Sequence, residues 1–343
     1  MEQALNTLFV MTQNTYVHLD HETVKVEVEK EVKLQVPLHH LGGLTIFGNV
    51  LVSPGLLAKC AEEGRQVIWL SATGRFVGRM EGPGSGNVLL RKAQWETVLD
   101  AARALPVARN MVAGKVQNSR ASLLRSAREA EDKEESSTLR GAAEALGATL
   151  ALLQRAATPE RVRGLEAEAA RVYFGVFTLM IRTERDLFGF SERSRRPPKD
   201  PINALLSFLY VLLLSDCSAA LQAVGLDAQG GFLHVLRPGR PALALDLMEE
   251  FRPLLADRLA LTLINRRQIT REDFDFREGG AVLLNEKGRK KVVTAYQERK
   301  RDTLQHPFLE QKTSFGLLPH LQARLLARHL RGDLEAYPPF LAK

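Results

Sequence analysis

Three acidic residues lie close together in an otherwise apolar stretch, residues 241–253, which reads PALALDLMEEFRP. Asp246, Glu249 and Glu250 are three and four positions apart, so on a helix they share one face. Carboxylates are rarely buried unless a cation pairs with them, and no lysine or arginine occurs from position 241 to 251. The spacing therefore predicts a metal ion or an external basic group as their partner. A solvated stripe on an amphipathic helix is the alternative.

A histidine precedes this helix in the segment GGFLHVLRPGRP, residues 230–241. A lone histidine beside apolar residues is commonly a core residue, but His234 leads directly into the acidic helix. One histidine and two carboxylates, with positions left for water or phosphate, suit Mg²⁺ or Mn²⁺ in phosphoryl chemistry. Zinc and non-haem iron accept the same ligand types.

A further carboxylate is expected from another element, because one helix cannot surround an ion. The alanine-rich segment RVRGLEAEAARVYF, residues 161–174, offers Glu166 and Glu168. Glutamate in such a helix is usually a surface residue that forms ion pairs. Spacing alone does not choose between the two.

Basic residues near these segments could form a positive rim for a DNA backbone, since arginine binds phosphate oxygens bidentately without reading bases. Solubilising surface charge is the alternative. The candidates are Arg161, Arg163, Arg193, Arg195, Arg196, Lys199, Arg237, Arg240 and Arg252. The sequence has no Walker A motif, no Gly-x-Ser-x-Gly elbow and no His-Glu-x-x-His motif.

The elements that must position these residues fall into two groups. Residues 1–83 contain short alternating segments rich in β-branched residues, which predict a small β-domain. Within it, Ser53 followed by Pro54 predicts a helix over residues 54–63. Residues 84–90 are the predicted linker. Residues 91–343 are rich in alanine, leucine and arginine and are predicted to form an all-helical catalytic domain. The fold class is therefore α+β.

Chain length, net charge and cysteine content narrow the class of protein. The 343 residues carry a formal charge of +7 with a pI near 9.5, which favours a polyanionic partner such as nucleic acid. Two distant cysteines, Cys60 and Cys217, indicate a reducing cytoplasm. The apolar run at residues 202–214 is too short to span a bilayer, so we expect a buried core helix and no membrane partner.

Four segments together resemble the CRISPR-associated spacer-acquisition integrases, the first of the two core adaptation proteins. They are RGLEAEAARVYF, DPINALLSFLYVLL, GLDAQGGFLHVLRPGRPALALDLMEEFRP and the preceding β-domain. The resemblance covers essentially the whole chain in the same order. The C-terminal segment QKTSFGLLPHLQARLLARHLRGDLEAYPPF is similar to that of type I systems, subtype I-C.

The resemblance implies that Glu166, His234 and Glu249 are the metal ligands and catalytic residues, with Mg²⁺ or Mn²⁺ bound. Many relatives have aspartate in the position of Glu249, which is one methylene longer. Asp246 and Glu250 match accessory acids, and Glu250 would support the ligands without contacting the ion. The choice of Glu166 over Glu168 rests on the resemblance, not on spacing.

The resemblance also implies the partners and the reaction. The β-domain would form a homodimer, and two such dimers would flank a dimer of the second adaptation protein. The substrate would be a short invader-derived DNA duplex, whose 3′-hydroxyl attacks the CRISPR repeat in a transesterification. Two alternatives are a stand-alone metal-dependent nuclease for branched DNA in repair, and a non-enzymatic DNA-binding scaffold. Strand joining separates the first from integration, and loss of activity in a chelator separates the second.

Overall fold

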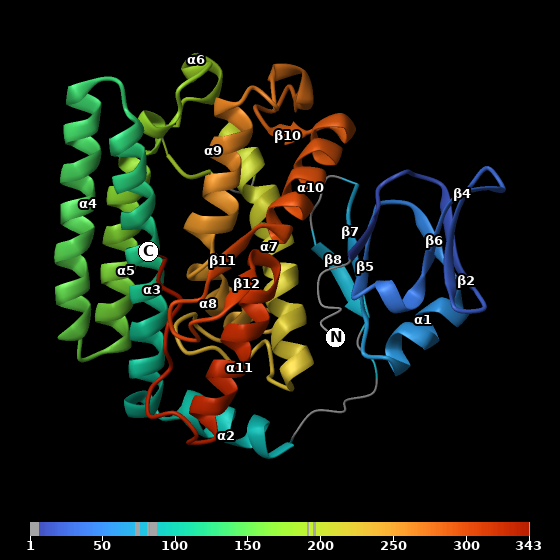
Figure 1. The fold of residues 1–343 in the computed structure, drawn as a ribbon, viewed down its shortest axis with the longest axis horizontal. Helices are drawn as coiled ribbons and strands as arrows, with labels where there is room; N and C mark the ends of the chain where they lie inside the picture. The colour runs from blue at the N-terminus through green and yellow to red at the C-terminus, as the bar shows by residue number, and fades with distance from the viewer. Residues whose placement is uncertain are drawn as a thin grey trace.

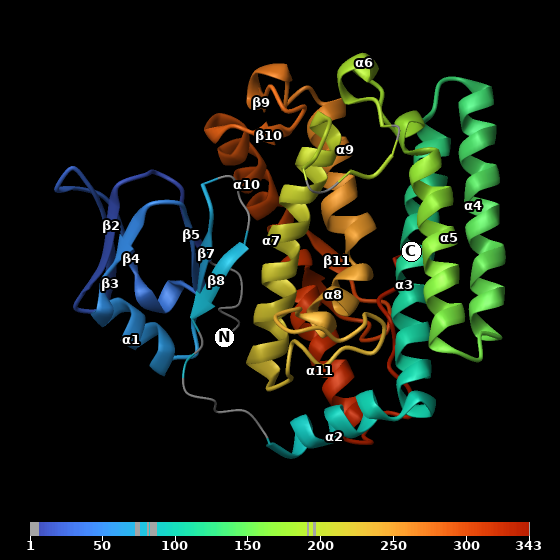
Figure 2. The same cartoon turned by 180° about the vertical axis from the view of Figure 1, so that it is seen from behind.

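The computed structural model describes residues 7–72, 76–80, 82, 88–190, 192–194 and 197–342. A β-rich region forms one side of the molecule and a larger helical region forms the other, as Figures 1 and 2 show from opposite sides. This arrangement confirms the α+β class and the order of the two regions.

The β-rich region contains two four-stranded sheets. The strand order is β4-β3-β2-β6 in one sheet and β1-β5-β7-β8 in the other. In the first sheet β2 and β3 form a hairpin closed by the pair Asp20–Thr23, and in the second β1, β5 and β7 run parallel. The strands are β1 (Thr7–Val10), β2 (Thr15–Asp20), β3 (Thr23–Val28), β4 (Glu31–Pro37), β5 (Gly43–Phe47), β6 (Val50–Val52), β7 (Gln66–Leu70) and β8 (Phe76–Met80).

Helix α1 (Pro54–Glu62) crosses over between these sheets. As predicted, Ser53 caps it: the Ser53 side chain accepts a hydrogen bond from the Leu56 amide, and Pro54 occupies the first turn, where its missing N–H costs nothing.

The second sheet is buried on both faces and joins the two regions. Alternate residues of a strand point to opposite faces. Leu44 and Ile46 therefore pack into the core of the β-rich region, whereas Phe47, Ile68 and Leu70 join the core of the helical region. The Phe47 ring lies 6.1 Å from that of Phe208, measured between centroids.

The helical region is built mainly from long helices with side-chain caps. Asp100, Asp132, Thr158 and Asp200 each accept a hydrogen bond from the first turn of the helix that follows. The helices are α2 (Val88–Leu99), α3 (Ala101–Glu129), α4 (Lys133–Gln154), α5 (Pro159–Gly175), α6 (Arg185–Phe188), α7 (Pro201–Val224), α8 (Ala242–Glu249), α9 (Arg258–Asn265), α10 (Glu286–Arg301) and α11 (Leu318–Leu330).

Two details differ from the sequence predictions. The predicted linker, residues 84–90, is too long at its C-terminal end, because α2 already begins at Val88. The helical region is also not purely helical. It contains two short antiparallel hairpins, β9 (Phe274–Phe276) with β10 (Val282–Leu284) and β11 (Thr303–Gln305) with β12 (Lys312–Ser314).

Helix α7 lies on the side of the helical region that faces the β-rich region (Figure 2). Among the described residues it is the one helix long and apolar enough, by length and composition, to cross a membrane. However, 61% of its apolar window is buried inside the protein, where α7 packs against α8, α9 and α11. This burial matches the predicted role of a core helix.

Candidate active site

The three acids of the α8 segment turn toward three different partners, although their spacing predicts one shared face. Helix α8 ends at Glu249, and the chain continues as a π-helical turn, Arg252–Asp257, before α9 begins. Pro253 cannot donate a helical hydrogen bond, which accounts for the break in the regular pattern. Asp246, Glu249 and Glu250 are all buried.

Asp246 holds the segment that carries His234. Its carboxylate accepts hydrogen bonds from the amides of Phe232 (2.6 Å), Leu233 (2.9 Å) and His234 (2.9 Å), and its Oδ1 lies 2.6 Å from His234 Nδ1. A Cβ atom on Gly231 would come within 2.7 Å of Asp246 Oδ2, so this close approach requires glycine. The bond at Nδ1 leaves His234 Nε2 free to act as a ligand.

Lys115 of α3 brings the two predicted carboxylate ligands together. Its ammonium group contacts Glu166 of α5 and lies 2.7 Å from Glu249 Oε2. His234 Nε2 lies 3.9 Å from Glu249 Oε1 on the other side of that carboxylate. Glu168, the alternative to Glu166, is exposed. The structure therefore brings Glu166 and Glu249 to one cation, Lys115, and places His234 beside Glu249.

Arg252 is the second cation beside Glu249. Its Nη1 lies 2.9 Å from Glu249 Oε1, and its guanidinium stacks on the Tyr210 ring at 4.7 Å from the centroid. Burial raises the pKa of Glu249, but Arg252, Lys115 and His234 outweigh this effect and hold it at about 2. Glu249 is therefore anionic at neutral pH, as a metal ligand must be.

A buried carboxylate, that of Asp257, binds the tyrosine on which Arg252 stacks. The Tyr210 hydroxyl donates a 2.7 Å hydrogen bond to Asp257 Oδ1 at the end of the π-helical turn. Burial raises the pKa of Asp257 to about 6, although Tyr210, Arg252 and Arg193 act in the opposite direction. Asp257, Tyr210 and Arg252 line a cavity of about 50 Å³ that opens beside Lys115 and Glu166.

Glu250 does not belong to this cluster, which corrects its prediction as an accessory acid. Its carboxylate contacts the C-terminal segment: the Tyr337 hydroxyl at 2.6 Å, the Phe340 amide at 2.7 Å and Gln322 Nε2 at 3.1 Å. Burial raises the pKa of Glu250 to about 8, because the hydrogen bonds from Tyr337, Phe340 and Gln322 offset the effect of burial only in part. Glu250 therefore fastens the end of α8 to the C-terminal segment.

The donor set suits a hard divalent cation. Two carboxylates and one imidazole nitrogen are ligands that Mg²⁺ and Mn²⁺ accept. Glu249 Oε2 is buried and makes no well-aligned hydrogen bond, although it is paired with Lys115. In the described part of the chain, no three His, Cys, Asp or Glu side chains converge closely enough to hold one ion. The ammonium of Lys115 separates the ligands, so an ion that joins them must displace it.

The basic residues predicted for the rim divide into two groups. Arg161, Lys199 and Arg237 are exposed, and Arg163 and Arg240 are half-buried at the site, each within 3.4 Å of a loop carbonyl. The prediction is wrong for Arg252, which is buried against Glu249, and for Arg193, whose guanidinium binds Asn203 and Ser207 inside the fold. Arg195 and Arg196 lie outside the described residues.

Sequence reasoning missed Lys115, Tyr210 and Asp257. Lys115 had a detectable signal, because it is a single lysine in the apolar helical segment MVAGKVQN, residues 111–118. A buried lysine in such a helix requires an acidic partner. Tyr210 and Asp257 had no comparable signal in the sequence.

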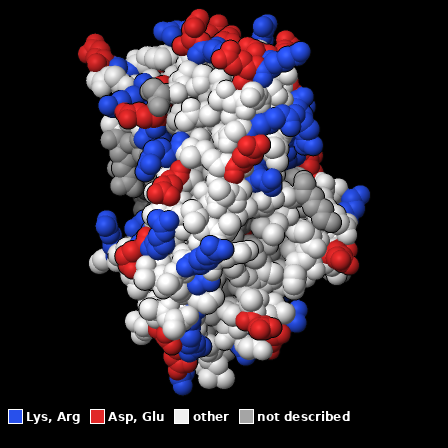
Figure 3. Space-filling view, turned by 90° about the vertical axis from the view of Figure 1, so that its left-hand side faces the viewer, with Lys and Arg blue, Asp and Glu red and all other residues white. Residues whose placement is uncertain are grey.

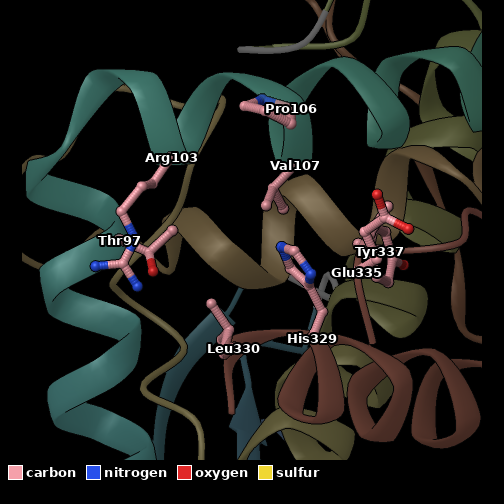
Figure 4. Close-up of a pocket in the computed structure, with 9 residues that line it drawn as sticks. Thr97, Arg103, Pro106, Val107, His329, Leu330, Glu335 and Tyr337 are labelled. Carbon is pink, nitrogen blue, oxygen red and sulfur yellow. The ribbon is translucent and has the colours of Figure 1, made fainter. Parts of the chain in front are cut away.

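The remaining hollows and charges lie away from the acidic cluster. A cavity of about 220 Å³ lies where the start of α3 meets the end of α11, lined by Arg103, His329 and Glu335 among others (Figure 4). On the face of the molecule that α4 and α5 occupy, basic and acidic groups are interspersed among uncharged ones, and no single-sign patch dominates (Figure 3).

The fold and the site define a two-region α+β protein whose helical region carries a carboxylate–histidine centre. Residues 8–298 match the family model described as "CRISPR associated protein Cas1". The chain is 53% identical over 341 residues to the CRISPR-associated endonuclease Cas1 1 of Moorella thermoacetica, with 99% of each chain covered. It is 48% identical over 347 residues to the CRISPR-associated endonuclease Cas1 2 of Rhodospirillum rubrum, with 100% of each covered.

Solved structures share the fold. A Cas1 protein from Thermotoga maritima has a TM-score of 0.83 at 24% identity, covering 98% of this chain and 100% of its own. A chain of a Cas6-RT-Cas1–Cas2 complex gives 0.82 at 25% identity, covering 99% and 36%. A casposase bound to integration product gives 0.84 at 21% identity, covering 99% and 95%. The protein belongs to the Cas1 family of CRISPR-associated endonucleases.

Proposed function

We propose that this protein is a divalent-metal-dependent DNA endonuclease and integrase of CRISPR adaptation, which inserts short invader-derived duplexes into the CRISPR array. The observation that carries the proposal is the cluster in which Glu166 and Glu249 share Lys115 while His234 Nε2 lies 3.9 Å from Glu249 Oε1. The fold likeness to a casposase bound to integration product is consistent with the strand-joining reaction.

Glu166, His234 Nε2 and Glu249 would hold Mg²⁺ or Mn²⁺. When bound, such an ion polarises the scissile phosphate, assists deprotonation of the attacking hydroxyl and offsets charge in the transition state. In integration that hydroxyl is the 3′-end of the captured duplex, which gives direct transesterification. In nuclease assays water occupies the same position.

The surrounding residues of the chain prepare these ligands. Asp246 keeps His234 in the tautomer with the proton on Nδ1, so that Nε2 presents its lone pair. Arg252 keeps Glu249 ionised and fixed in orientation, and Tyr210 with Asp257 restrains Arg252 from behind. Lys115, once displaced from between the carboxylates, would be a cation available to a phosphate oxygen.

The DNA backbone would follow the exposed cations near His234. Arg237 and Arg240 flank the histidine on one side, and Arg163 contacts the Leu233 carbonyl on the other. Arg161, two positions before Arg163 on α5, would extend this positive rim, and Lys199 stays a predicted DNA contact. Arginine contacts to phosphates supply affinity without sequence readout.

The proposed partners follow from the same family. The β-rich region would form a homodimer, and Cas2 would join two such dimers, in line with the relative solved in a Cas6-RT-Cas1–Cas2 complex. Both partners and the DNA are expected in the cytoplasm. The assignment to subtype I-C stays a prediction.

The proposal is tested by strand joining. Purified protein is incubated with a supercoiled plasmid and a short labelled duplex that carries free 3′-hydroxyls, in Mn²⁺, Mg²⁺ or EDTA. We expect label in the plasmid only with metal, and its loss in the His234→Ala variant. The control is His40→Ala, which removes an exposed histidine of the β-rich region.

Each other outcome rejects part of the proposal. Nicking without joining, also when Cas2 is added, would indicate a nuclease that acts on branched DNA. DNA binding with neither reaction in any metal would indicate a scaffold. Activity that survives both EDTA and His234→Ala would remove the assigned site.

A further inference from the structure

Two apolar side chains project into solvent directly after His234, the histidine proposed to bind the metal. Val235 and Leu236 are 51% and 42% exposed and follow His234 without an intervening residue. They belong to the connection between His234 and α8, which we call the tip loop, residues 235–240. Apolar exposure at this position is not explained by the fold, because the segment just before it, Phe232 and Leu233, is buried.

The tip loop is short and anchored at both ends. On its N-terminal side Asp246 binds three successive amides up to His234, and on its C-terminal side the Leu243 amide donates to the Ala228 carbonyl at 2.9 Å. The loop reverses through Gly239, whose φ of 72° favours glycine, with the Arg240 amide 3.0 Å from the Arg237 carbonyl. Val235 and Leu236 are therefore held in place beside the site.

The charges around the pair identify the chemistry of the ligand. Arg237 and Arg240 follow the apolar pair within four residues, and Arg240 reaches back to the Val235 carbonyl at 3.4 Å. A protein partner that covered Val235 and Leu236 would also have to match two adjacent arginines. DNA matches both features, because each nucleotide joins a base, whose flat faces are apolar, to an anionic phosphate. Apolar side chains that enter between bases and arginines that contact phosphates are a known combination in DNA-binding proteins.

We propose that Val235 and Leu236 form a wedge that contacts an unstacked nucleobase next to the reacting phosphate. This inference rests on the proposed function, since it needs DNA at the metal site. Bases of an intact duplex are stacked and hidden, so the wedge can act only at a frayed end, a branch or a melted step. The wedge therefore makes the site selective for DNA that is already open, or easily opened, at the point of reaction.

The inference is tested with 2-aminopurine, a base whose fluorescence rises when it is unstacked. The probe replaces the base next to the branch of a synthetic branched duplex, and fluorescence and binding are measured in EDTA, where no reaction occurs. We expect wild-type protein to raise the emission at least threefold at saturation. The double variant Val235→Ser/Leu236→Ser should lose most of that rise while the Kd changes less than tenfold, because the arginines remain.

Two further variants make the result decisive. Leu152→Ser changes a leucine of α4 that is 45% exposed, and it should behave as wild type. Val235→Ile/Leu236→Met keeps an apolar pair and should retain the rise. Unchanged thermal unfolding of the serine variant would show that it is folded.

The outcomes separate this inference from the proposed function. If wild-type protein binds the branched duplex, joins strands with metal and yet leaves the emission unchanged, the wedge is refuted and the integrase proposal stands. An emission rise that survives the double serine variant refutes the wedge as well. If wild-type protein neither binds nor processes DNA, the proposed function fails and the wedge fails with it.

Discussion

Replacing Asp246 by asparagine tests how the site is prepared. The Asp246 carboxylate is buried and accepts four hydrogen bonds, three from successive amides and one from His234 Nδ1. An asparagine keeps one oxygen and presents an NH₂ group in place of the other. If the oxygen still accepts hydrogen bonds from the Phe232 and Leu233 amides, the NH₂ group faces the His234 amide and Nδ1. All three groups are then donors, and none of them has an acceptor.

The expected loss follows from this conflict. Hydrogen bonds to a charged group contribute roughly 1.5–3 kcal/mol each, and a buried donor left unsatisfied costs about 1–3 kcal/mol. We therefore expect Asp246→Asn to lower the free energy of unfolding by about 2–4 kcal/mol. The new NH₂ group also favours the His234 tautomer with the proton on Nε2, which leaves Nε2 without the lone pair that would bind the metal. Loss of such a partner typically lowers metal affinity about 10- to 100-fold.

Two measurements check the prediction. Urea unfolding reports the stability, and calorimetric titration with Mn²⁺ reports the affinity without reference to activity. The control is Asp132→Asn at the cap of α4, where one amide at 2.7 Å is the partner; asparagine caps a helix about as well as aspartate, so this variant should cost less than about 0.5 kcal/mol and leave Mn²⁺ affinity unchanged. If Asp246→Asn binds Mn²⁺ as wild type and loses less than about 0.5 kcal/mol, our account of Asp246 is refuted.

Three further predictions use single residues of the same region. Glu166→Gln should abolish joining, whereas Glu168→Gln, at the exposed neighbouring position, should leave it within twofold in the plasmid assay; equal losses would reject the assignment. The pKa of Asp257 is raised from 3.8 to about 6, so its contribution to stability is full below pH 3.8 and is lost as the pH rises through 6. Relative to Asp257→Asn, wild type should therefore lose up to ~3 kcal/mol over that range in urea titrations, and parallel curves would contradict this. Tyr337→Phe removes the 2.6 Å donor to Glu250 and should lower stability by about 1–3 kcal/mol, measured by thermal or urea unfolding; an unchanged midpoint would show that this contact is dispensable.

The features that the sequence predicted correctly are local. Ser53 and Pro54 indicate the start of α1, because a cap and its first turn lie within three residues of each other. The change from alternating β-branched segments to long alanine- and leucine-rich periods marked the two regions, since side-chain periodicity is a property of each element alone. The apolar composition of α7 indicated a core helix for the same reason.

The prediction of the candidate site rested on local residue patterns and on the family resemblance. Residue types and spacing were enough to select His234 and the acids of α8, and the resemblance to a family selected Glu166. The direction in which each acidic side chain points was not predictable. Glu249 and Glu250 are neighbours in sequence, yet one faces Lys115 and the other Tyr337. A small rotation about the helix axis decides which side chain meets the site, and packing sets that rotation.

The sequence by itself determined the two regions, the identity of the apolar core helix and the residue types available for metal chemistry, because these depend on composition and on contacts close along the chain. Only the tertiary structure decided that Lys115, 51 residues from Glu166 in the chain, lies between the two carboxylates proposed as metal ligands. It also decided that Arg252 is buried against Glu249 instead of facing DNA. Such contacts join residues of separate helices, and their geometry is set by how whole helices pack.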